Sequence, residues 1–247
     1  MKNYTLECCV DTLESAKAAI EGGATRLELC ANIIIGGTSP SPDLLRQIRS
    51  ISDISIRAML RPRFGDFCYT DSEFQIMRAE LEEYRKLGAD GVVFGILLPD
   101  GSLDISRMRV LCNDADNLNV TLHRAFDVAR DPLETLEQAQ ALKIDTILTS
   151  GQKGDAWTGR KLIAELVQRA PDIEILAGAG INEQNLSALY HETGCKAFHL
   201  SGRILEDSPM VFRRPEVFMG LPSMSEFERW TCSSKKIATV HALLDLL

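Results

Sequence analysis

The sequence lacks the features that mark membrane, nucleic-acid-binding and secreted proteins. No stretch of the 247 residues approaches the roughly 20 consecutive apolar residues of a membrane span. Positive charge is scarce: 27 lysines and arginines stand against 35 aspartates and glutamates, for a net charge of −8. Nucleic acids and anionic membranes require a basic surface. The N-terminus shows no signal-peptide pattern and enters a strand-like segment at once. We therefore expect a cytoplasmic protein with neither nucleic acid nor membrane as a partner.

Two patterns typical of cofactor and metal sites are also missing. The seven cysteines include no Cys-x-x-Cys pair, which argues against zinc. No Gly-x-Gly-x-x-Gly follows the first strand-like segment, which argues against a dinucleotide-binding sheet. An odd number of cysteines without a secretion signal indicates reduced thiols rather than a set of disulfides.

Strand-like and helix-like segments alternate along the chain. The strand-like segments are 4–10, 25–30, 55–60, 91–96, 119–123, 145–149, 173–177 and 196–200. The helix-like segments are 13–21, 42–52, 71–87, 104–115, 132–142, 158–170, 183–192 and 226–247. Eight strand–helix units in about 250 residues predict an α/β fold, a single-domain (β/α)8 TIM barrel over residues 1–247. A doubly wound sheet is the rival architecture.

One segment interrupts this alternation. Residues 202–225 contain Pro209, Pro215 and Pro222 and show no clear periodicity. Because they follow the eighth strand, we expect a long loop that begins at the C-terminal face of the barrel. Long loops in compact domains are usually functional or disordered. This loop could cover the site, pair with another subunit, or be a plain surface loop.

Two strands near the N-terminus carry the same Glu-x-Cys pattern. Glu7 and Cys9 belong to the first strand, Glu28 and Cys30 to the second. Side chains alternate along a strand, so each Glu shares a face with its Cys. Parallel strands can bring both pairs to one depth. Thiolates select soft metals, which makes Cys9 and Cys30 candidate Cu(I) ligands. Buried cysteine also packs as a small hydrophobe, and this interpretation stays open.

The two glutamates have two interpretations. Glu7 and Glu28 could transfer protons with a tuned pKa. They could instead belong to a structural ion-pair network with Arg26, Arg61 or Arg124, because a buried carboxylate needs such a partner. The sequence leaves both open.

The segment 123–127 is the sharpest single motif. His123 ends an apolar strand, where an imidazole could transfer a proton or bind a metal. Asp127 follows within four residues and is a further catalytic candidate, although it could instead cap a turn.

Glycines and hydroxyls at the ends of the last strands predict an anion site. Gly178 and Gly180 follow the seventh strand, Ser201 follows the eighth, and Ser150 follows the sixth. The loops after strands seven and eight are where barrels bind phosphate. Arg61 and Arg124 could add positive charge, since guanidinium groups bind carboxylates and phosphates bidentately. Arg61 could equally pair with Glu28. The anion-site interpretation describes an enzyme acting on a small phosphorylated or carboxylated metabolite.

Taken together, these motifs resemble those of the CutC family, often called copper homeostasis proteins. The matching segments are 7–11, 26–30, 36–41, 61–69, 123–127, 148–151, 178–181 and 198–201. The resemblance implies a (β/α)8 barrel, a cytoplasmic location, homo-oligomeric assembly and a copper role with Cu(I) on Cys9 and Cys30. Phe64 departs from the pattern, because the family has glycine there.

Overall fold

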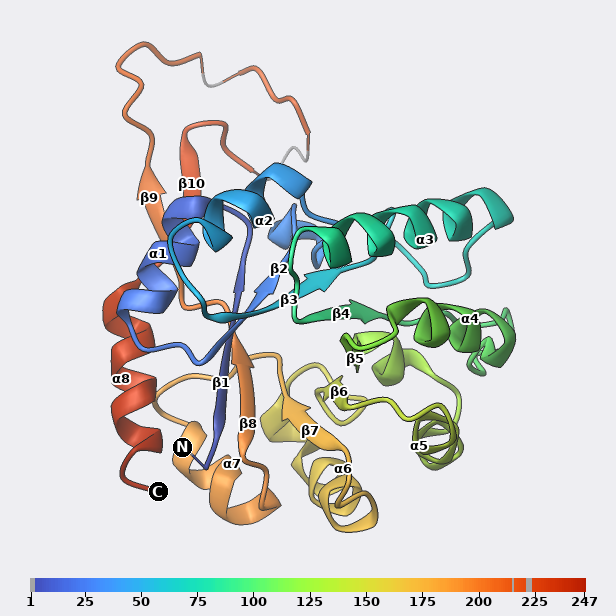
Figure 1. Cartoon of the computed structure of the whole chain (residues 1–247). Coiled ribbons are helices and arrows are strands. Elements are labelled where there is room, and N and C mark those ends of the chain that lie inside the picture. The colour runs from blue at the N-terminus through green and yellow to red at the C-terminus, as the bar shows by residue number, and fades with distance from the viewer. Residues whose placement is uncertain (1–2, 215, 221–223) are drawn as a thin grey trace.

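The computed structural model describes residues 3–214, 216–220 and 224–247. Eight parallel strands form a closed barrel in which each strand pairs with the next and β8 pairs with β1 (Figure 1). This confirms the predicted (β/α)8 barrel. The strands are β1 Thr5–Val10, β2 Arg26–Leu29, β3 Ser55–Met59, β4 Gly91–Phe94, β5 Asn119–Leu122, β6 Thr146–Thr149, β7 Glu174–Ala177 and β8 Ala197–Leu200.

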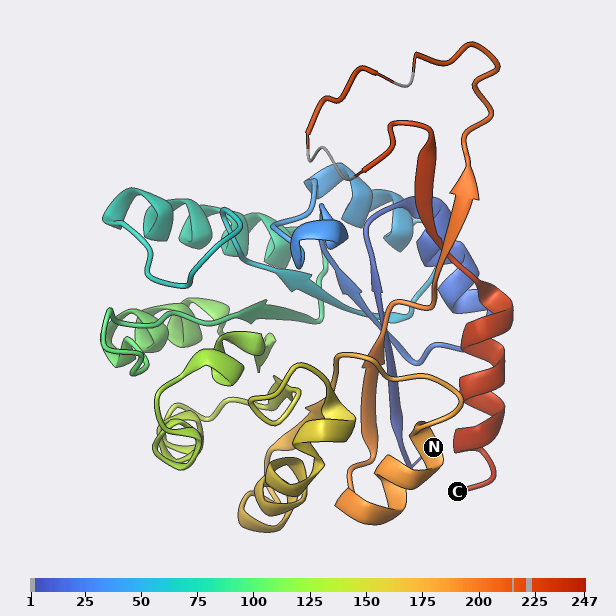
Figure 2. The same cartoon turned by 180° about the vertical axis from the view of Figure 1, so that it is seen from behind.

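Helices surround the barrel in both views (Figures 1 and 2). They are α1 Leu13–Glu21, α2 Pro42–Arg49, α3 Asp71–Lys86, α4 Ile105–Ala115, α5 Pro132–Ala141, α6 Ala156–Arg169, α7 Leu186–Thr193 and α8 Ser234–Leu244. Two 3-10 helices, η1 Ile33–Ile35 and η2 Arg124–Val128, follow β2 and β5. Local sequence explains the ends of several helices: Thr70 and Glu73, for example, form a reciprocal capping box at the start of α3. Among the described residues no helix is long and apolar enough to cross a membrane.

The main hydrophobic core lies between the strands and the helices, and the barrel interior is more polar. Leu6, Cys8 and Val10 of β1 belong to that core, as alternation along a strand requires. Cys8 therefore packs where the sequence predicts, with its Sγ 3.8 Å from that of Cys232. Glu7, on the opposite face of β1, is fully buried inside the barrel.

The segment after β8 differs from the prediction of a loop followed by a helix from residue 226. It begins with strand β9, Arg203–Asp207, which pairs antiparallel with β10, Glu228–Cys232. The helix begins only at Ser234, after Ser233 caps it. The start predicted for the last helix is therefore wrong, because the backbone of residues 228–232 forms hydrogen bonds with β9 instead of helical ones. We call residues 203–232 the excursion; its described residues extend away from the barrel (Figures 1 and 2).

The rest of the excursion has no regular structure among its described residues. Pro209 lies just past β9 in this irregular part. Pro215 and Pro222 lie outside the described residues.

Candidate functional site

The sheet register brings residues from both ends of the chain together. Cys9 of β1 aligns with Glu28 of β2, and Glu7 aligns with both Arg26 of β2 and His199 of β8. All five side chains follow the inward-facing alternation of their strands. His199 reaches the N-terminal strands because barrel closure pairs β8 with β1.

Two thiols meet at the C-terminal ends of β1 and β2, the end of the barrel that we call the mouth. The Sγ atoms of Cys9 and Cys30 are 3.5 Å apart, and both cysteines are free. Cys30 is fully buried, and Cys9 retains 9% exposure. Met59 of β3 packs with them in a small cluster separate from the main core. At this distance both sulfurs can ligate a single ion.

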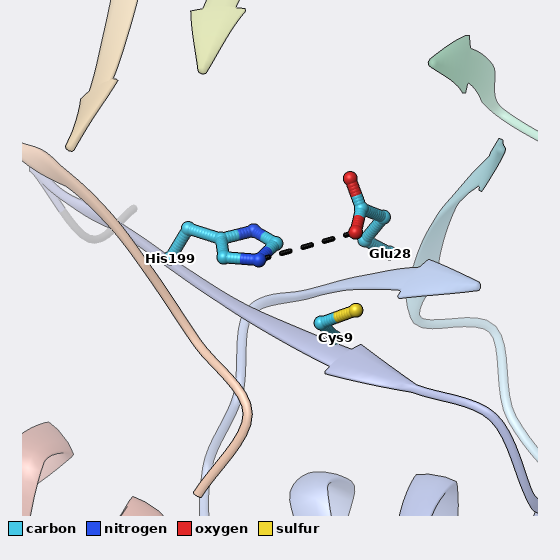
Figure 3. A group of neighbouring side chains, drawn as sticks. All are labelled: Cys9, Glu28 and His199. Atoms are coloured by element: carbon cyan, nitrogen blue, oxygen red, sulfur yellow. Dashed lines mark ion pairs between the residues drawn. The ribbon is translucent and has the colours of Figure 1, made fainter. Parts of the chain in front are cut away.

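A second group of possible ligands shares Cys9. Ligand atoms of Cys9, Glu28 and His199 all lie within 4.8 Å of one another (Figure 3). The Nε2 of His199 is 3.9 Å from Glu28 Oε2, the pair marked in the figure. These three residues offer one sulfur, one oxygen and one nitrogen, a mixed set suited to a borderline or soft metal.

His199 lies between two buried carboxylates. Its Nδ1 is 2.8 Å from Glu7 Oε1, and the other carboxylate oxygen of Glu7 accepts a hydrogen bond from Arg26 Nε at 2.5 Å. Burial favours the neutral acid, but Arg26 and His199 outweigh it and lower the pKa of Glu7 to about 2. Burial likewise opposes a charged His199, yet Glu28, Cys9 and Glu7 raise its pKa well above the ordinary value. His199 is therefore a cation at neutral pH and must lose a proton to ligate a metal.

The pKa values of the other two members of the group, Glu28 and Cys9, are both raised. Burial raises the pKa of Glu28, although the charge of His199 opposes the shift. The hydrogen bond with Cys30, together with burial, raises the pKa of the Cys9 thiol well above its usual value. A metal that binds Cys9 must therefore displace a proton, so binding strengthens as pH rises.

A cavity of about 790 Å³ opens at the mouth. It is lined by eight of the candidates that the sequence singles out: Cys9, Glu28, Arg61, His123, Arg124, Asp127, Gly180 and Ser201. The other four do not line it: Glu7 lies deeper inside the barrel, and Cys30, Ser150 and Gly178 are covered by their neighbours.

Arg61 does not pair with Glu28 in the part of the chain that the structure describes. Its Nη1 donates to the carbonyl of Gly37 and its Nη2 to that of Gly65, both at 2.9 Å. Its guanidinium lies 5.1 Å from the centre of the Phe67 ring. The alternative of an Arg61–Glu28 ion pair is thus not realised.

His123 is buried and fixed by its backbone neighbour. Its Nδ1 accepts a hydrogen bond from the backbone N–H of Ala125 at 3.2 Å, and its ring centre lies 4.7 Å from that of Phe67. Burial, reinforced by the charge of Arg61, lowers the pKa of His123 to about 3. The imidazole is therefore neutral at physiological pH, which distinguishes it sharply from His199.

Asp127 organises the loop after β6. Its carboxylate accepts hydrogen bonds from the Thr149 hydroxyl at 2.5 Å and from the backbone N–H of Ser150 at 3.0 Å. It also accepts from Arg124 Nε at 2.7 Å, and Arg124 Nη2 in turn binds the Ser150 hydroxyl. These bonds favour the turn-holding role for Asp127, while Arg124 stays partly exposed at the cavity.

The glycine-rich turn after β7 has two distinct parts. Gly178 is a packing residue, because a Cβ there would lie 2.6 Å from Leu148 Cδ1. Ala179 and Gly180 both adopt left-handed backbone angles, with φ of 72° and 76°. The Gly180 carbonyl accepts hydrogen bonds from Asn182 Nδ2 at 2.9 Å and from Asn185 Nδ2 at 2.8 Å. Asn182 therefore holds this turn in addition to preceding α7.

The sequence patterns assign no role to two residues of the site, His199 and Met59. His199 is one polar residue among several at the ends of the strands, two positions before Ser201. Barrel closure would have aligned it with Glu7, since the last strand must pair with the first. Met59 follows the same inward alternation on β3 as Arg57, and its apolar side chain gave no signal of its own.

The fold and the mouth define a (β/α)8-barrel protein with a thiol, carboxylate and histidine group at the C-terminal ends of its strands. The CutC family model matches residues 4–204, and the chain belongs to the CutC family.

Curated relatives cover nearly the whole chain. A CutC family protein of Bacteroides fragilis is 44% identical over 240 residues, 96% of each chain. One from Vibrio vulnificus is 41% identical over 228 residues, 91% of each. These relatives thus extend past residue 204, where the family match ends.

Solved structures agree with the fold. A structure of CutC from Streptococcus agalactiae, described as a proposed copper homeostasis protein, is 30% identical to this chain and superposes with a TM-score of 0.77. It covers 80% of this chain and 98% of its own. A phosphoribosylanthranilate isomerase from Pyrococcus furiosus, at 11% identity and a TM-score of 0.59, shares the fold over 99% of this chain and 100% of its own.

Proposed function

We propose that this protein binds Cu(I) through Cys9 and Cys30 and serves copper homeostasis in the cytoplasm. The observation that carries the proposal is the 3.5 Å separation of two free thiols, of which Cys9 lines the cavity and Cys30 lies buried behind it. Membership of the CutC family supports a link to copper. Thiolates are the ligands that Cu(I) prefers.

The surroundings of the thiols favour a soft ion further. Met59 packs on the pair and carries a thioether, another soft donor. His199 lies close enough to Cys9 to ligate after losing its proton. Glu28 offers a hard oxygen, which Cu(I) does not favour.

The direct test is an anaerobic Cu(I) titration against a competing chelator. We expect stoichiometric, tight binding in the wild type and its loss in the Cys9→Ser/Cys30→Ser variant. Cys68→Ser/Cys112→Ser is the matched control, because these two half-buried thiols lie outside the cluster. Equal affinity in the wild type and the Cys9→Ser/Cys30→Ser variant would contradict the proposal.

A second candidate function is an enzyme acting on a small phosphorylated or carboxylated metabolite. The observation that favours it is the pairing of a cationic His199 with Glu28, whose pKa is raised, on the cavity wall. Adjacent titratable groups with perturbed pKa values are a feature of acid–base sites. In this function Glu28 and His199 transfer protons and Glu7 holds His199 in place.

Solvent hydrogen exchange tests this second function without knowledge of the product. A panel of carboxylated and phosphorylated metabolites is incubated with the protein in D₂O, and deuterium uptake is followed by mass spectrometry. We expect uptake into at least one compound with the wild type and its loss with Glu28→Gln. Uptake that persists in Glu28→Gln would remove that residue from the reaction.

We also propose that the protein assembles as a homo-oligomer through the excursion. Large apolar side chains are exposed along it: Met210, Val211, Phe212, Val217, Phe218 and Met219. Contiguous exposed apolar groups of this kind mark interaction surfaces.

A further inference from the structure

Three residues that line the cavity each hold a buried polar atom that lacks a hydrogen-bond partner within the described residues. The atoms are Arg61 Nε, His123 Nε2 and Glu28 Oε1. A buried donor or acceptor left without a partner destabilises the folded protein. Three such atoms around one cavity indicate a ligand that supplies the missing partners.

Arg61 contributes a charge that the protein leaves uncompensated. Its guanidinium donates to backbone carbonyls and stacks near Phe67, and no ion pair of the described residues includes it. The side chain is only 7% exposed. A buried cation is usually paired, so the position calls for an anion from outside the chain.

His123 contributes a hydrogen-bond donor in a fixed direction. Because Nδ1 accepts from the backbone N–H of Ala125, the neutral ring carries its proton on Nε2. Nε2–H is then a donor with no acceptor among the described residues. A neutral imidazole in this form hydrogen-bonds an oxyanion without transferring its proton.

Glu28 contributes a hydrogen-bond acceptor. Oε2 faces His199, whereas Oε1 has no partner in the described part of the chain. This oxygen can accept a hydrogen bond from a ligand hydroxyl. The wall therefore presents two donors, one of them cationic, and one acceptor.

We propose that the cavity binds a small hydroxylated anion, with its carboxylate or phosphate group held by His123 Nε2–H and Arg61 and a nearby hydroxyl held by Glu28 Oε1. The inference deepens the second candidate function by naming its substrate class, and it rests on that function's cavity. It does not depend on copper. It also makes His123 a binding residue rather than the proton-transfer group that the sequence allowed.

The test follows the imidazole ¹⁵N–¹H signal of His123 by NMR while a small anion is titrated. The probes are glycolate, which has a hydroxyl beside its carboxylate, acetate, which lacks it, and inorganic phosphate. We expect saturable shifts with glycolate and about tenfold weaker binding of acetate, the loss of one hydrogen bond. Saturation by phosphate in preference to glycolate would assign the phosphate form of the ligand.

Variants locate the binding. His123→Phe keeps a ring against Phe67 and removes the donor, and Arg61→Met removes the charge; we expect each to weaken glycolate binding at least tenfold. Arg61→Lys keeps the charge and should bind more tightly than Arg61→Met. Binding by the variants is followed through the other imidazole and backbone amide signals. Circular dichroism confirms folding, and two independent variants keep the test valid if one fails to fold.

Two results would overturn the inference. One is the absence of a saturable shift with any probe at tens of millimolar. The other is equal glycolate affinity in wild type, His123→Phe and Arg61→Met. The Cys9→Ser/Cys30→Ser variant should retain anion binding, which separates this inference from the copper proposal. Binding without deuterium exchange would leave the ligand site standing and remove the enzyme function.

Discussion

Single residues inside the barrel carry charge that the fold must balance. Arg26 donates to Glu7 and also lies 2.7 Å from Glu174 Oε2. Glu7 in turn positions His199 at the edge of the candidate site. The ion pairs of Arg26 with Glu174 and Glu7, which lie below the mouth, therefore help to position His199 in the candidate site.

We expect Arg26→Leu to lower the free energy of unfolding strongly. The change leaves the buried Glu7 charge without its cation, and breaking a buried pair costs about 3–5 kcal/mol. Denaturant unfolding should show a loss of this order. The double variant Arg26→Leu/Glu7→Gln should recover part of it, because no lone charge remains. A double variant less stable than Arg26→Leu would contradict the assignment.

Acid should unfold the protein partly through Glu7. Its pKa falls from 4.5 to about 2 on folding, so its carboxylate stabilises the fold above pH 4.5, and this stability is lost as pH falls toward 2. Titration of Glu7 over this pH range changes the free energy of unfolding by about 3 kcal/mol. His199 is protonated in both states there and adds no slope, since its pKa is raised from 6.5.

The measurement is the urea unfolding free energy against pH for wild type and Glu7→Gln. The Gln variant should be less stable at pH 5 but lose less stability on acidification. Parallel curves would show that Glu7 does not titrate as described.

At the scale of elements, the sequence could predict most of the barrel because each strand and helix is bounded locally. The expected helix over 13–21 agrees with α1, which begins after the N-cap Thr12 and ends before the C-cap Gly22. The strand β10 could not be predicted in this way, because it exists by pairing with β9, more than twenty residues earlier. Non-local pairing leaves no local pattern.

The same distinction applies to the candidate site. Alternation along β1 and β2 predicts that Cys9 and Cys30 share the inner face of the barrel. The two Glu-x-Cys pairs do not lie at one depth as expected, because the register aligns Cys9 with Glu28, so the sequence alone could not predict the 3.5 Å approach of the two thiols. The role of His199 required knowledge of which strand closes the barrel. The partners of Arg61 are loop carbonyls whose positions no sequence period encodes.

Helix α6 meets the loop after β6 at a glycine-on-glycine contact. A Cβ on Gly159 would lie 1.8 Å from the Ser150 carbonyl oxygen and 2.8 Å from Gly151 Cα. Alanine normally stabilises a helix interior over glycine by about 1 kcal/mol. Here Gly159→Ala should instead destabilise by about 2–3 kcal/mol, because backbone must move.

Thermal unfolding tests whether Gly159→Ala destabilises the protein rather than stabilising it. Gly154→Ala is the matched control, since nothing lies within 4 Å of its added Cβ, and it should stay close to wild type. A Gly159→Ala variant at or above wild-type stability would disprove the close contact.

At the scale of the whole molecule, the excursion is the part that the barrel does not require. Just past the paired strands β9 and β10, the Ser208 N–H donates a hydrogen bond to the Phe227 carbonyl at 2.7 Å. Replacing residues 208–227 with an Asn-Gly turn should therefore preserve β9 and β10. Because the exposed apolar groups are removed, we expect the proposed homo-oligomer to dissociate.

Light scattering after size exclusion gives the mass directly. The shortened protein should have the mass of a monomer and should keep the wild-type circular dichroism spectrum and Cu(I) stoichiometry. An unchanged oligomer mass would place the interface on the barrel itself.

The join between β1 and β8 has a consequence for synthesis of the chain. Cys9 and Glu28 leave the ribosome early, whereas His199 emerges only after four-fifths of the chain. A nascent chain that ends before β8 has the thiols but neither the imidazole nor a closed wall around them. Complete ligand binding thus reports a finished barrel, and a fragment arrested earlier exposes its cysteines to whatever metal or oxidant the compartment holds.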